Sequence, residues 1–233
     1  MGELRRIGTL EGDQTFPVYR AEPAAGATAA IIVIPEIFGI NPGIRAKCDA
    51  WAKLGYLAVA PDIFWRFAEG EELDPDVPDQ FDKALKNMGQ FDLDACIRDI
   101  EALIHHLKRE GNCAKVGLVG FCLGGFVAYT AAARTDIDAS VGYYGVSIDQ
   151  HLGEAQAIAN PLILHIAGAD HFVTADAQKA IHQALDAHPR VTLHDYPGLD
   201  HGFAAEMGQR RDEQGAQLAD RRTEAFFTEH LAA

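Results

Sequence analysis

Short apolar runs alternate with amphipathic segments along most of the chain. The run AAIIVIP at residues 29–35 is continuously apolar, which is typical of a parallel strand buried on both faces. Further strands are predicted at residues 57–63, 139–145, 162–166 and 191–196. The stretch KVGLVGFCLGGFVA at residues 115–128 predicts another strand, a glycine turn and the beginning of a helix.

Helical periodicity fills the intervals between these strands. Asn41 and Pro42 supply an N-cap and a first-turn proline, and Gly55 is expected to end that helix. From Asp92 to about Arg109, apolar residues recur on one helical face. Two more helices are predicted at residues 174–187 and 212–231.

Strands that alternate with helices predict an α/β fold, in which helices cover both faces of a mostly parallel central sheet. Residues 3–23 are expected to add an antiparallel hairpin at one edge of that sheet. The acidic, proline-bearing segment 68–80 is predicted to be a long surface excursion, either part of a lid over a pocket or a solvated loop. No break in composition divides residues 1–233, so a single domain is expected.

Composition excludes several classes of function. The chain of 233 residues is 48% hydrophobic and carries a net charge of −14 without any basic run, so no nucleic-acid partner is expected. It shows neither an apolar segment of membrane-span length nor a signal-peptide core, so we expect a cytoplasmic protein without membrane contact. The cysteines lack C-x-x-C spacing, which indicates free thiols at Cys48, Cys96, Cys113 and Cys122.

The glycine turn between the predicted strand and helix carries a candidate nucleophile. Cys122 stands in the frame Gly120-Phe121-Cys122-Leu123-Gly124, which is the G-x-S-x-G nucleophile elbow with sulfur in place of the hydroxyl. The glycines are needed because a Cβ beside the strained turn would collide with backbone. The following helix directs its N-terminal N–H groups at the thiol and favours thiolate. The alternative interpretation is a tight turn with a buried structural cysteine.

Two later strand ends supply the groups that a cysteine nucleophile requires. Asp170 follows the strand at 162–166 and His201 follows the strand at 191–196, so the chain order is nucleophile, acid, histidine, as in α/β-hydrolases. His201 would accept the thiol proton, and Asp170 would orient the imidazole and stabilise its protonated form. Read alone, Asp170 could be a loop cap and His201 a surface histidine. His171 and His194 are less suitably placed bases.

Backbone N–H groups and one further carboxylate complete the predicted site. The amides of Leu123 and Ile37 are the expected oxyanion-hole donors. Glu36 ends the strand at 29–35, where it could affect the thiol or only reach water or a charged partner. The ten histidines show no H-E-x-x-H and no zinc-like cluster, so neither a metal nor another cofactor is expected.

With these residues in place, the chain resembles the dienelactone hydrolase family of α/β-hydrolases. The resemblance rests on five segments that span most of the chain: PEIFG (35–39), GYLAVAPD (55–62), GFCLGG (120–125), GADHFV (168–173) and DHGF (200–203). It implies a triad of Cys122, His201 and Asp170. It also implies that Glu36 contacts the thiol and helps to ionise it when substrate enters.

One departure from the family pattern affects the substrate. Dienelactone hydrolases hold the substrate carboxylate with two arginines, and neither residues 81–88 nor residues 203–206 contain one. Losing a bidentate clamp of this kind changes which substrate can be held, but leaves the hydrolytic residues in place. The expected pocket residues are Phe38, Trp65, Arg66, Phe81 and Phe203.

These observations predict a hydrolase of small esters or lactones, of the carboxymethylenebutenolidase type, that acts through a thioester on Cys122. A carboxylesterase or acyl thioesterase with an uncharged substrate remains an alternative. A binding or redox-sensing protein that keeps the pocket without turnover is another. A monomer or a weak homo-oligomer is expected.

Overall fold

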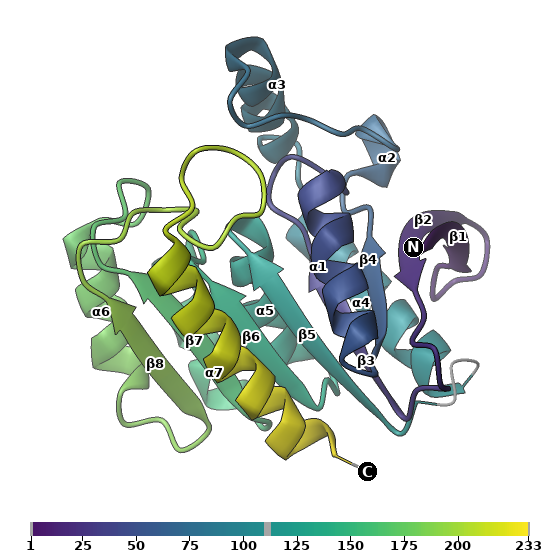
Figure 1. Ribbon diagram of the computed structural model, residues 1–233. Helices are drawn as coiled ribbons and strands as arrows, with labels where there is room; N and C mark the ends of the chain where they lie inside the picture. The colour runs from purple at the N-terminus through teal and green to yellow at the C-terminus, as the bar shows by residue number, and fades with distance from the viewer. Residues whose placement is uncertain (1, 110–112, 233) are drawn as a thin grey trace.

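The computed structural model describes residues 2–109 and 113–232 and contains one sheet of eight strands in this part of the chain (Figure 1). Their order across the sheet is β1-β2-β4-β3-β5-β6-β7-β8. The strands are β1 (Glu3–Gly8), β2 (Thr15–Ala21), β3 (Ala29–Ile34), β4 (Leu57–Pro61), β5 (Lys115–Phe121), β6 (Ala139–Tyr143), β7 (Leu162–Ala167) and β8 (Val191–Tyr196). The predicted α/β class is therefore confirmed.

The sheet is antiparallel only at one edge. The predicted hairpin is confirmed, because β1 pairs antiparallel with β2 and β2 pairs antiparallel with β4. The pairs from β4 through β3, β5, β6 and β7 to β8 are all parallel. Every residue of β3 is buried, as expected for a central strand covered on both faces. The carboxyl ends of the parallel strands consequently meet at one edge of the sheet.

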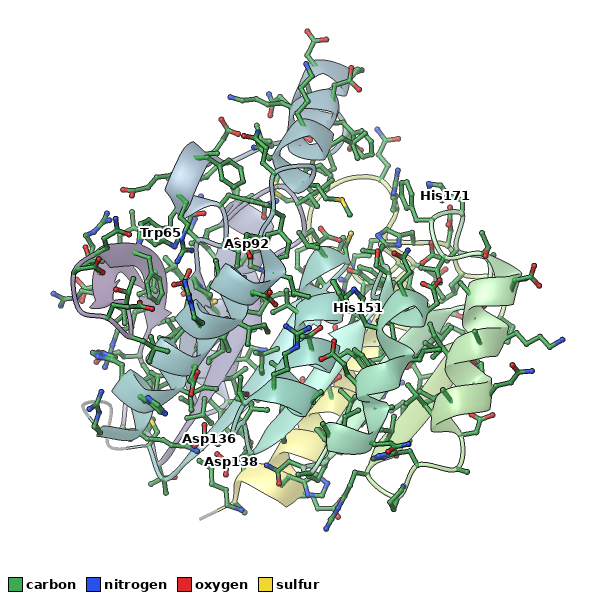
Figure 2. The ribbon with its side chains drawn as sticks, turned by 180° about the vertical axis from the view of Figure 1, so that it is seen from behind. Trp65, Asp92, Asp136, Asp138, His151 and His171 are labelled. Carbon is green, nitrogen blue, oxygen red and sulfur yellow. The ribbon has the colours of Figure 1, made fainter. Side chains whose placement is uncertain are left out.

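Helices cover both faces of the sheet. α1 (Pro42–Lys53) and α7 (Glu213–Leu231) lie on the face seen in Figure 1, where the Trp51 and Phe227 rings are 5.4 Å apart. On the other face, seen from the front in Figure 2, lie α4 (Leu93–Arg109), α5 (Leu123–Arg134) and α6 (Ala175–Leu185). Asn41 is the N-cap of α1, and its side-chain oxygen accepts a hydrogen bond from the Ile44 N–H at 3.1 Å. No described helix is both long and apolar enough to cross a membrane.

Three elements were not predicted. α2 (Trp65–Ala68) and α3 (Pro78–Met88) frame the acidic segment, and a 3-10 helix, η1 (Ile148–Ala157), follows β6. α3 stands above the carboxyl ends of the strands (Figure 1). The Leu73 N–H donates to the Phe38 carbonyl at 3.0 Å, which joins the acidic segment to the loop after β3. The excursion is thus partly helical and lies beside the pocket.

Candidate active site

Cys122 lies where β5 turns into α5, in a strained backbone conformation. Its φ is 56° and its ψ is −114°, values that side-chain-bearing residues rarely adopt. Neighbouring glycines make the turn possible. A Cβ at Gly120 would clash with the Gly124 carbonyl, and one at Gly124 would lie 2.5 Å from the Ile34 carbonyl oxygen. The structure therefore has the geometry of a nucleophile elbow at the predicted position.

Asp170 and His201 come together at the carboxyl ends of β7 and β8. The His201 Nδ1 lies 2.8 Å from the Asp170 Oδ2, and the two side chains are only 4% and 2% exposed. The other oxygen, Oδ1, accepts from the N–H groups of Phe172 at 2.8 Å and Val173 at 3.1 Å. Asp170 is thus fixed within its own loop while it orients the imidazole, which is the role of the acid in a triad.

The free nitrogen of His201 is directed into the site. Nε2 is buried and forms no hydrogen bond with a described residue. Burial alone would lower the pKa of His201, but the negative charges of Cys122 and Asp170 outweigh this effect and raise the pKa to about 10. An imidazole whose pKa is raised in this way can accept the proton of a nearby thiol and hold it.

Glu36 lies in the same enclosed region. Burial raises the pKa of Glu36, and the charges of His201 and Lys47 oppose that rise. Lys47 is buried against Phe121, with Nζ 4.6 Å from the ring centroid and 3.2 Å from the Glu206 Oε1. A carboxyl group whose pKa is raised can exchange a proton with a neighbouring thiol more readily than an ordinary glutamate.

Tyr144 also belongs to this region, although it was not among the predicted site residues. It has a φ of 39°, its ring meets the His201 ring edge-on at 5.0 Å, and its buried hydroxyl lacks a partner among the described residues. The charges of Glu36 and Cys122 act on that hydroxyl. Its position directly after β6 was the available signal, since polar groups at strand ends converge in such sheets.

A pocket opens above Cys122 and His201. Phe38 and Phe81, two of the expected pocket residues, line it, together with Ile37 and with Leu85 and Met88 of α3. Its walls are mostly apolar, which suits a small organic substrate. Neither the Ile37 nor the Leu123 N–H enters a turn, loop or cap hydrogen bond within residues 2–109 and 113–232, so both amides are available to an oxyanion.

Three predicted pocket residues lie elsewhere, and those predictions were wrong. Arg66 forms a bidentate ion pair with Asp99 at 2.6 and 3.0 Å, and Trp65 Nε1 donates to the same carboxylate at 2.9 Å. This pairing holds both side chains against α4. Phe203 is buried beneath the site, where its ring packs 5.5 Å from the Tyr144 ring.

Arg210, which no sequence pattern indicated, reaches the pocket instead. Its guanidinium lies 5.8 Å from the Phe81 ring and 5.5 Å from the Phe172 ring, and it forms no ion pair with a described residue. The loop between His201 and α7 turns back over the pocket mouth and brings it there. Spacing from His201 alone does not reveal such a return, because it depends on the loop path.

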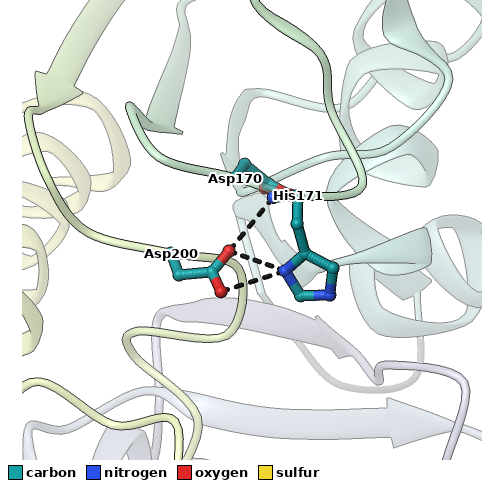
Figure 3. Close-up of side chains that lie close together, drawn as sticks. All are labelled: Asp170, His171 and Asp200. Atoms are coloured by element: carbon teal, nitrogen blue, oxygen red, sulfur yellow. Dashed lines mark hydrogen bonds and ion pairs between the residues drawn. The ribbon is translucent and has the colours of Figure 1, made fainter.

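One group of side chains has metal-like spacing. Asp170, His171 and Asp200 each offer a ligand atom within 4.8 Å of the others (Figure 3). All three side chains already form hydrogen bonds, since His171 Nδ1 lies 2.8 Å from Asp200 Oδ1 and Asp170 holds His201. A cation would have to displace bonds that order the site, so this arrangement favours hydrogen bonding over coordination.

The elbow, the histidine–aspartate pair and the parallel sheet define an α/β-hydrolase. The dienelactone hydrolase family model matches residues 16–231, and the chain belongs to that family. Its relatives include the carboxymethylenebutenolidase of Pseudomonas putida, 35% identical over 91% of each chain. A protein of Azospirillum brasilense named "Putative carboxymethylenebutenolidase" is 40% identical over 94% of this chain and 95% of its own.

A solved structure agrees with these sequence comparisons. The "Putative Dienelactone Hydrolase from Klebsiella pneumoniae" superposes with a TM-score of 0.84 and 25% identity, over 98% of this chain and 99% of that one. The protein is therefore a carboxylic ester or lactone hydrolase of the dienelactone hydrolase type.

Proposed function

We propose that the protein hydrolyses small esters or lactones with Cys122 as its nucleophile. The observation that carries this proposal is the imidazole of His201, held on Asp170 at 2.8 Å through one nitrogen and unpartnered at the other within the described residues. The unpartnered nitrogen belongs to the same pocket wall as Cys122. A merely structural cysteine would not require an oriented base beside it.

The reaction follows the logic of acyl transfer. The Cys122 thiolate adds to the carbonyl carbon, and the N–H groups of Leu123 and Ile37 hold the resulting oxyanion. The C–O bond then breaks as His201 protonates the leaving oxygen, which leaves a thioester on Cys122. His201 next takes a proton from water, the water oxygen attacks the thioester, and the acid leaves as the thiol is regenerated. Glu36 assists proton transfer to and from the thiol.

The residues at the pocket mouth also bear on the charge of the substrate. Arg210 is an unpaired cation at a mostly apolar pocket mouth, within the part of the chain described. The relatives are named for a butenolide that bears a carboxymethylene group, and a guanidinium binds a carboxylate through charge-assisted hydrogen bonds. We therefore propose an anionic lactone as substrate, with Arg210 in place of the two arginines that the sequence lacks.

The nucleophile is tested with a p-nitrophenyl ester and with cis- and trans-dienelactone. Cys122→Ala is expected to abolish turnover of all three compounds, whereas Cys48→Ala, which removes a fully buried core thiol, should retain it. Intact-mass spectrometry should detect an acyl adduct in the wild type but not in Cys122→Ala. Undiminished turnover by Cys122→Ala would exclude the cysteine mechanism, and absence of turnover in the wild type would favour thioesters or a binding role.

The charge preference is tested by Arg210→Gln against Arg211→Gln. Arg211 is the matched control, because its guanidinium pairs with Glu206 at 2.9 Å and Glu213 at 2.8 Å. Arg210→Gln should lower kcat/KM for dienelactone by about tenfold to a hundredfold, the range for a lost hydrogen bond to a charged group, and should spare the neutral ester. An equal loss on both substrates, or on neither, would favour the uncharged-substrate alternative.

A further inference from the structure

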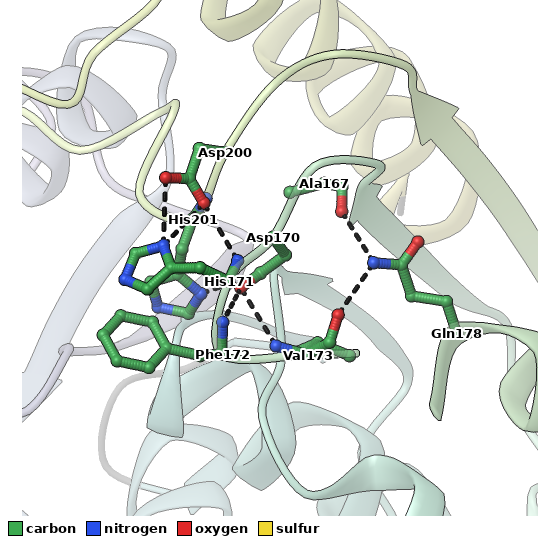
Figure 4. A network of polar contacts seen from close by, with 8 residues as sticks. All are labelled: Ala167, Asp170, His171, Phe172, Val173, Gln178, Asp200 and His201. Atoms are coloured by element: carbon green, nitrogen blue, oxygen red, sulfur yellow. Dashed lines mark hydrogen bonds and ion pairs between the residues drawn. The ribbon is translucent and has the colours of Figure 1, made fainter. Parts of the chain in front are cut away.

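The two loops that carry the acid and the base each direct a carboxylate at the other loop (Figure 4). Asp170, in the loop after β7, reaches forward to His201. Asp200, in the loop after β8, reaches back to His171: its Oδ1 accepts from the His171 N–H at 3.1 Å and lies 2.8 Å from the His171 Nδ1. The links are therefore reciprocal, and only the first of them belongs to the triad.

Asp200 also fixes the backbone of the base. The His201 N–H donates to the Asp200 Oδ1 at 2.7 Å, so a single oxygen contacts both the residue after the acid and the base itself. Burial would raise the pKa of Asp200, but the hydrogen bonds from His171 and His201 outweigh it and lower that pKa. Asp200 is accordingly a carboxylate that joins the two loops near neutral pH.

Among the described residues, no other hydrogen bond joins the two loops at their tips. The Gly168 N–H donates to the Tyr196 carbonyl at 3.0 Å and the Ala169 N–H donates to the Leu199 carbonyl at 2.9 Å, both at the loop bases. Beyond Ala169, the hydrogen bonds between the two loops in the described residues all run through Asp170 or Asp200.

A shift of the contact between Asp200 and His171 would change the pocket wall as well as the position of His201. Phe172 follows His171, lines the pocket, and packs its ring 4.9 Å from the His201 ring. The His171 and Asp200 side chains are themselves 46% and 53% exposed. Exposed ion pairs contribute little to global stability, so the main consequence of this contact is local order.

We propose that Asp200 and His171 form a positioning pair that holds Asp170 and His201 in register, so that His201 Nε2 stays directed at Cys122. The inference rests on the proposed cysteine mechanism. The pair touches neither the substrate nor the reacting atoms, and it acts by restricting where the base can lie. Loss of such restraint lowers the rate of the chemical step more than it weakens substrate binding.

The test uses Asp200→Ala, His171→Ala and the double variant with the p-nitrophenyl ester. Each single variant should lower kcat by about tenfold to a hundredfold, as sub-ångström displacement of a catalytic group does, and should leave KM within about twofold. The double variant should be no worse than Asp200→Ala alone, because Asp200→Ala already removes the side-chain contact that His171→Ala breaks. Asp200→Asn keeps an oxygen for the two backbone N–H groups and should be the mildest of the series.

Asp195→Ala is the matched control. Asp195 pairs with His182 at 3.0 Å, with side chains 52% and 29% exposed, away from the pocket, so its loss should change neither kcat nor the melting temperature appreciably. A readout independent of turnover is the downfield proton resonance of the His201–Asp170 hydrogen bond, which should broaden or disappear in Asp200→Ala.

The possible failures are distinguishable. If wild-type turnover does not depend on Cys122, the proposed function is wrong. If it does, but Asp200→Ala keeps kcat within about twofold and retains the resonance, the positioning pair is wrong. A loss of kcat in Asp200→Ala that only follows unfolding, with Asp200→Asn and His171→Ala fully active, would also overturn it.

Discussion

Two buried histidines, His201 and His165, have exposures of only 4% and 0%, yet their surroundings favour opposite charge states. His201 lies between a carboxylate and the Cys122 sulfur, and its pKa is raised to about 10 despite burial. For His165, burial lowers the pKa well below its usual value, and the positive charges of His194 and Arg222 lower it further. Burial is common to both, so the charge of the partners decides the outcome.

The hydrogen bonds of His165 suit a neutral ring. Its Nδ1 lies 2.8 Å from the Tyr196 hydroxyl and its Nε2 lies 3.0 Å from the Thr223 hydroxyl. Arg222 donates to the Tyr196 hydroxyl at 3.1 Å. A neutral imidazole donates from one nitrogen and accepts at the other, so both hydroxyls can be satisfied without a charge.

A single direction of donation satisfies the whole chain of bonds. It runs from Arg222 through Tyr196, His165 and Thr223 to Tyr143. The Tyr143 hydroxyl lies 2.7 Å from the Thr223 hydroxyl and donates to Asp220 at 3.0 Å. The chain begins at a cation and ends at an anion, and it ties α7 to β6, β7 and β8. We therefore propose that His201 serves chemistry, whereas His165 serves packing, although a sequence shows only two histidines near strands.

The strongest way to break this contrast is to give His201 a neutral partner. Asp170→Asn should lower kcat by about a thousandfold or more, because the amide can stabilise the wrong tautomer and offers no charge to the imidazolium. Steady-state kinetics on the p-nitrophenyl ester measure this loss. Asp220→Asn, at the anionic end of the His165 chain, should retain kcat, and an equal loss in both variants would mean that the two histidines are coupled.

The converse change breaks the His165 chain and leaves the site alone. Thr223→Val keeps the side-chain shape but removes the hydroxyl between His165 and Tyr143, so buried polar groups lose a partner. This should lower the free energy of unfolding by about 1–3 kcal/mol while kcat stays unchanged. Chemical denaturation measures the effect, and Thr228→Val, at an exposed position of the same helix, is the control that should cost far less.

The comparison also shows what a sequence can predict here. The strands, the elbow and the chain order of Cys122, Asp170 and His201 follow from local patterns, because apolar runs and glycine turns act over short spans. The irregular η1 was not predicted. The helix α3 was not predicted either, because it begins inside an acidic, proline-bearing segment. The sequence could not show that Arg210 lies at the pocket and Arg66 does not. The position of a long side chain depends on acids and aromatic rings that are distant in the sequence.

The charges around His165 and His201 should also make the two histidines contribute to stability with opposite pH dependences. A folded-state pKa below the unfolded value of about 6.5 means that the unfolded chain binds more protons, so the His165 contribution is present above about pH 6.5 and is lost as the pH falls. A folded-state pKa of about 10 means the reverse, so the His201 contribution is present below about pH 6.5 and is lost as the pH rises towards 10.

Each contribution changes the free energy of unfolding by at most about 1.4 kcal/mol per pH unit, the limit for one proton. Urea denaturation between about pH 5 and pH 10 should show both limbs in the wild type, since these limits bracket the two histidines. His165→Gln, which does not titrate, should flatten the acid limb only. Cys122→Ala removes a side chain that raises the His201 pKa and should flatten the alkaline limb only. If either substitution altered both limbs equally, the charges of the two histidines would not be set by their separate partners.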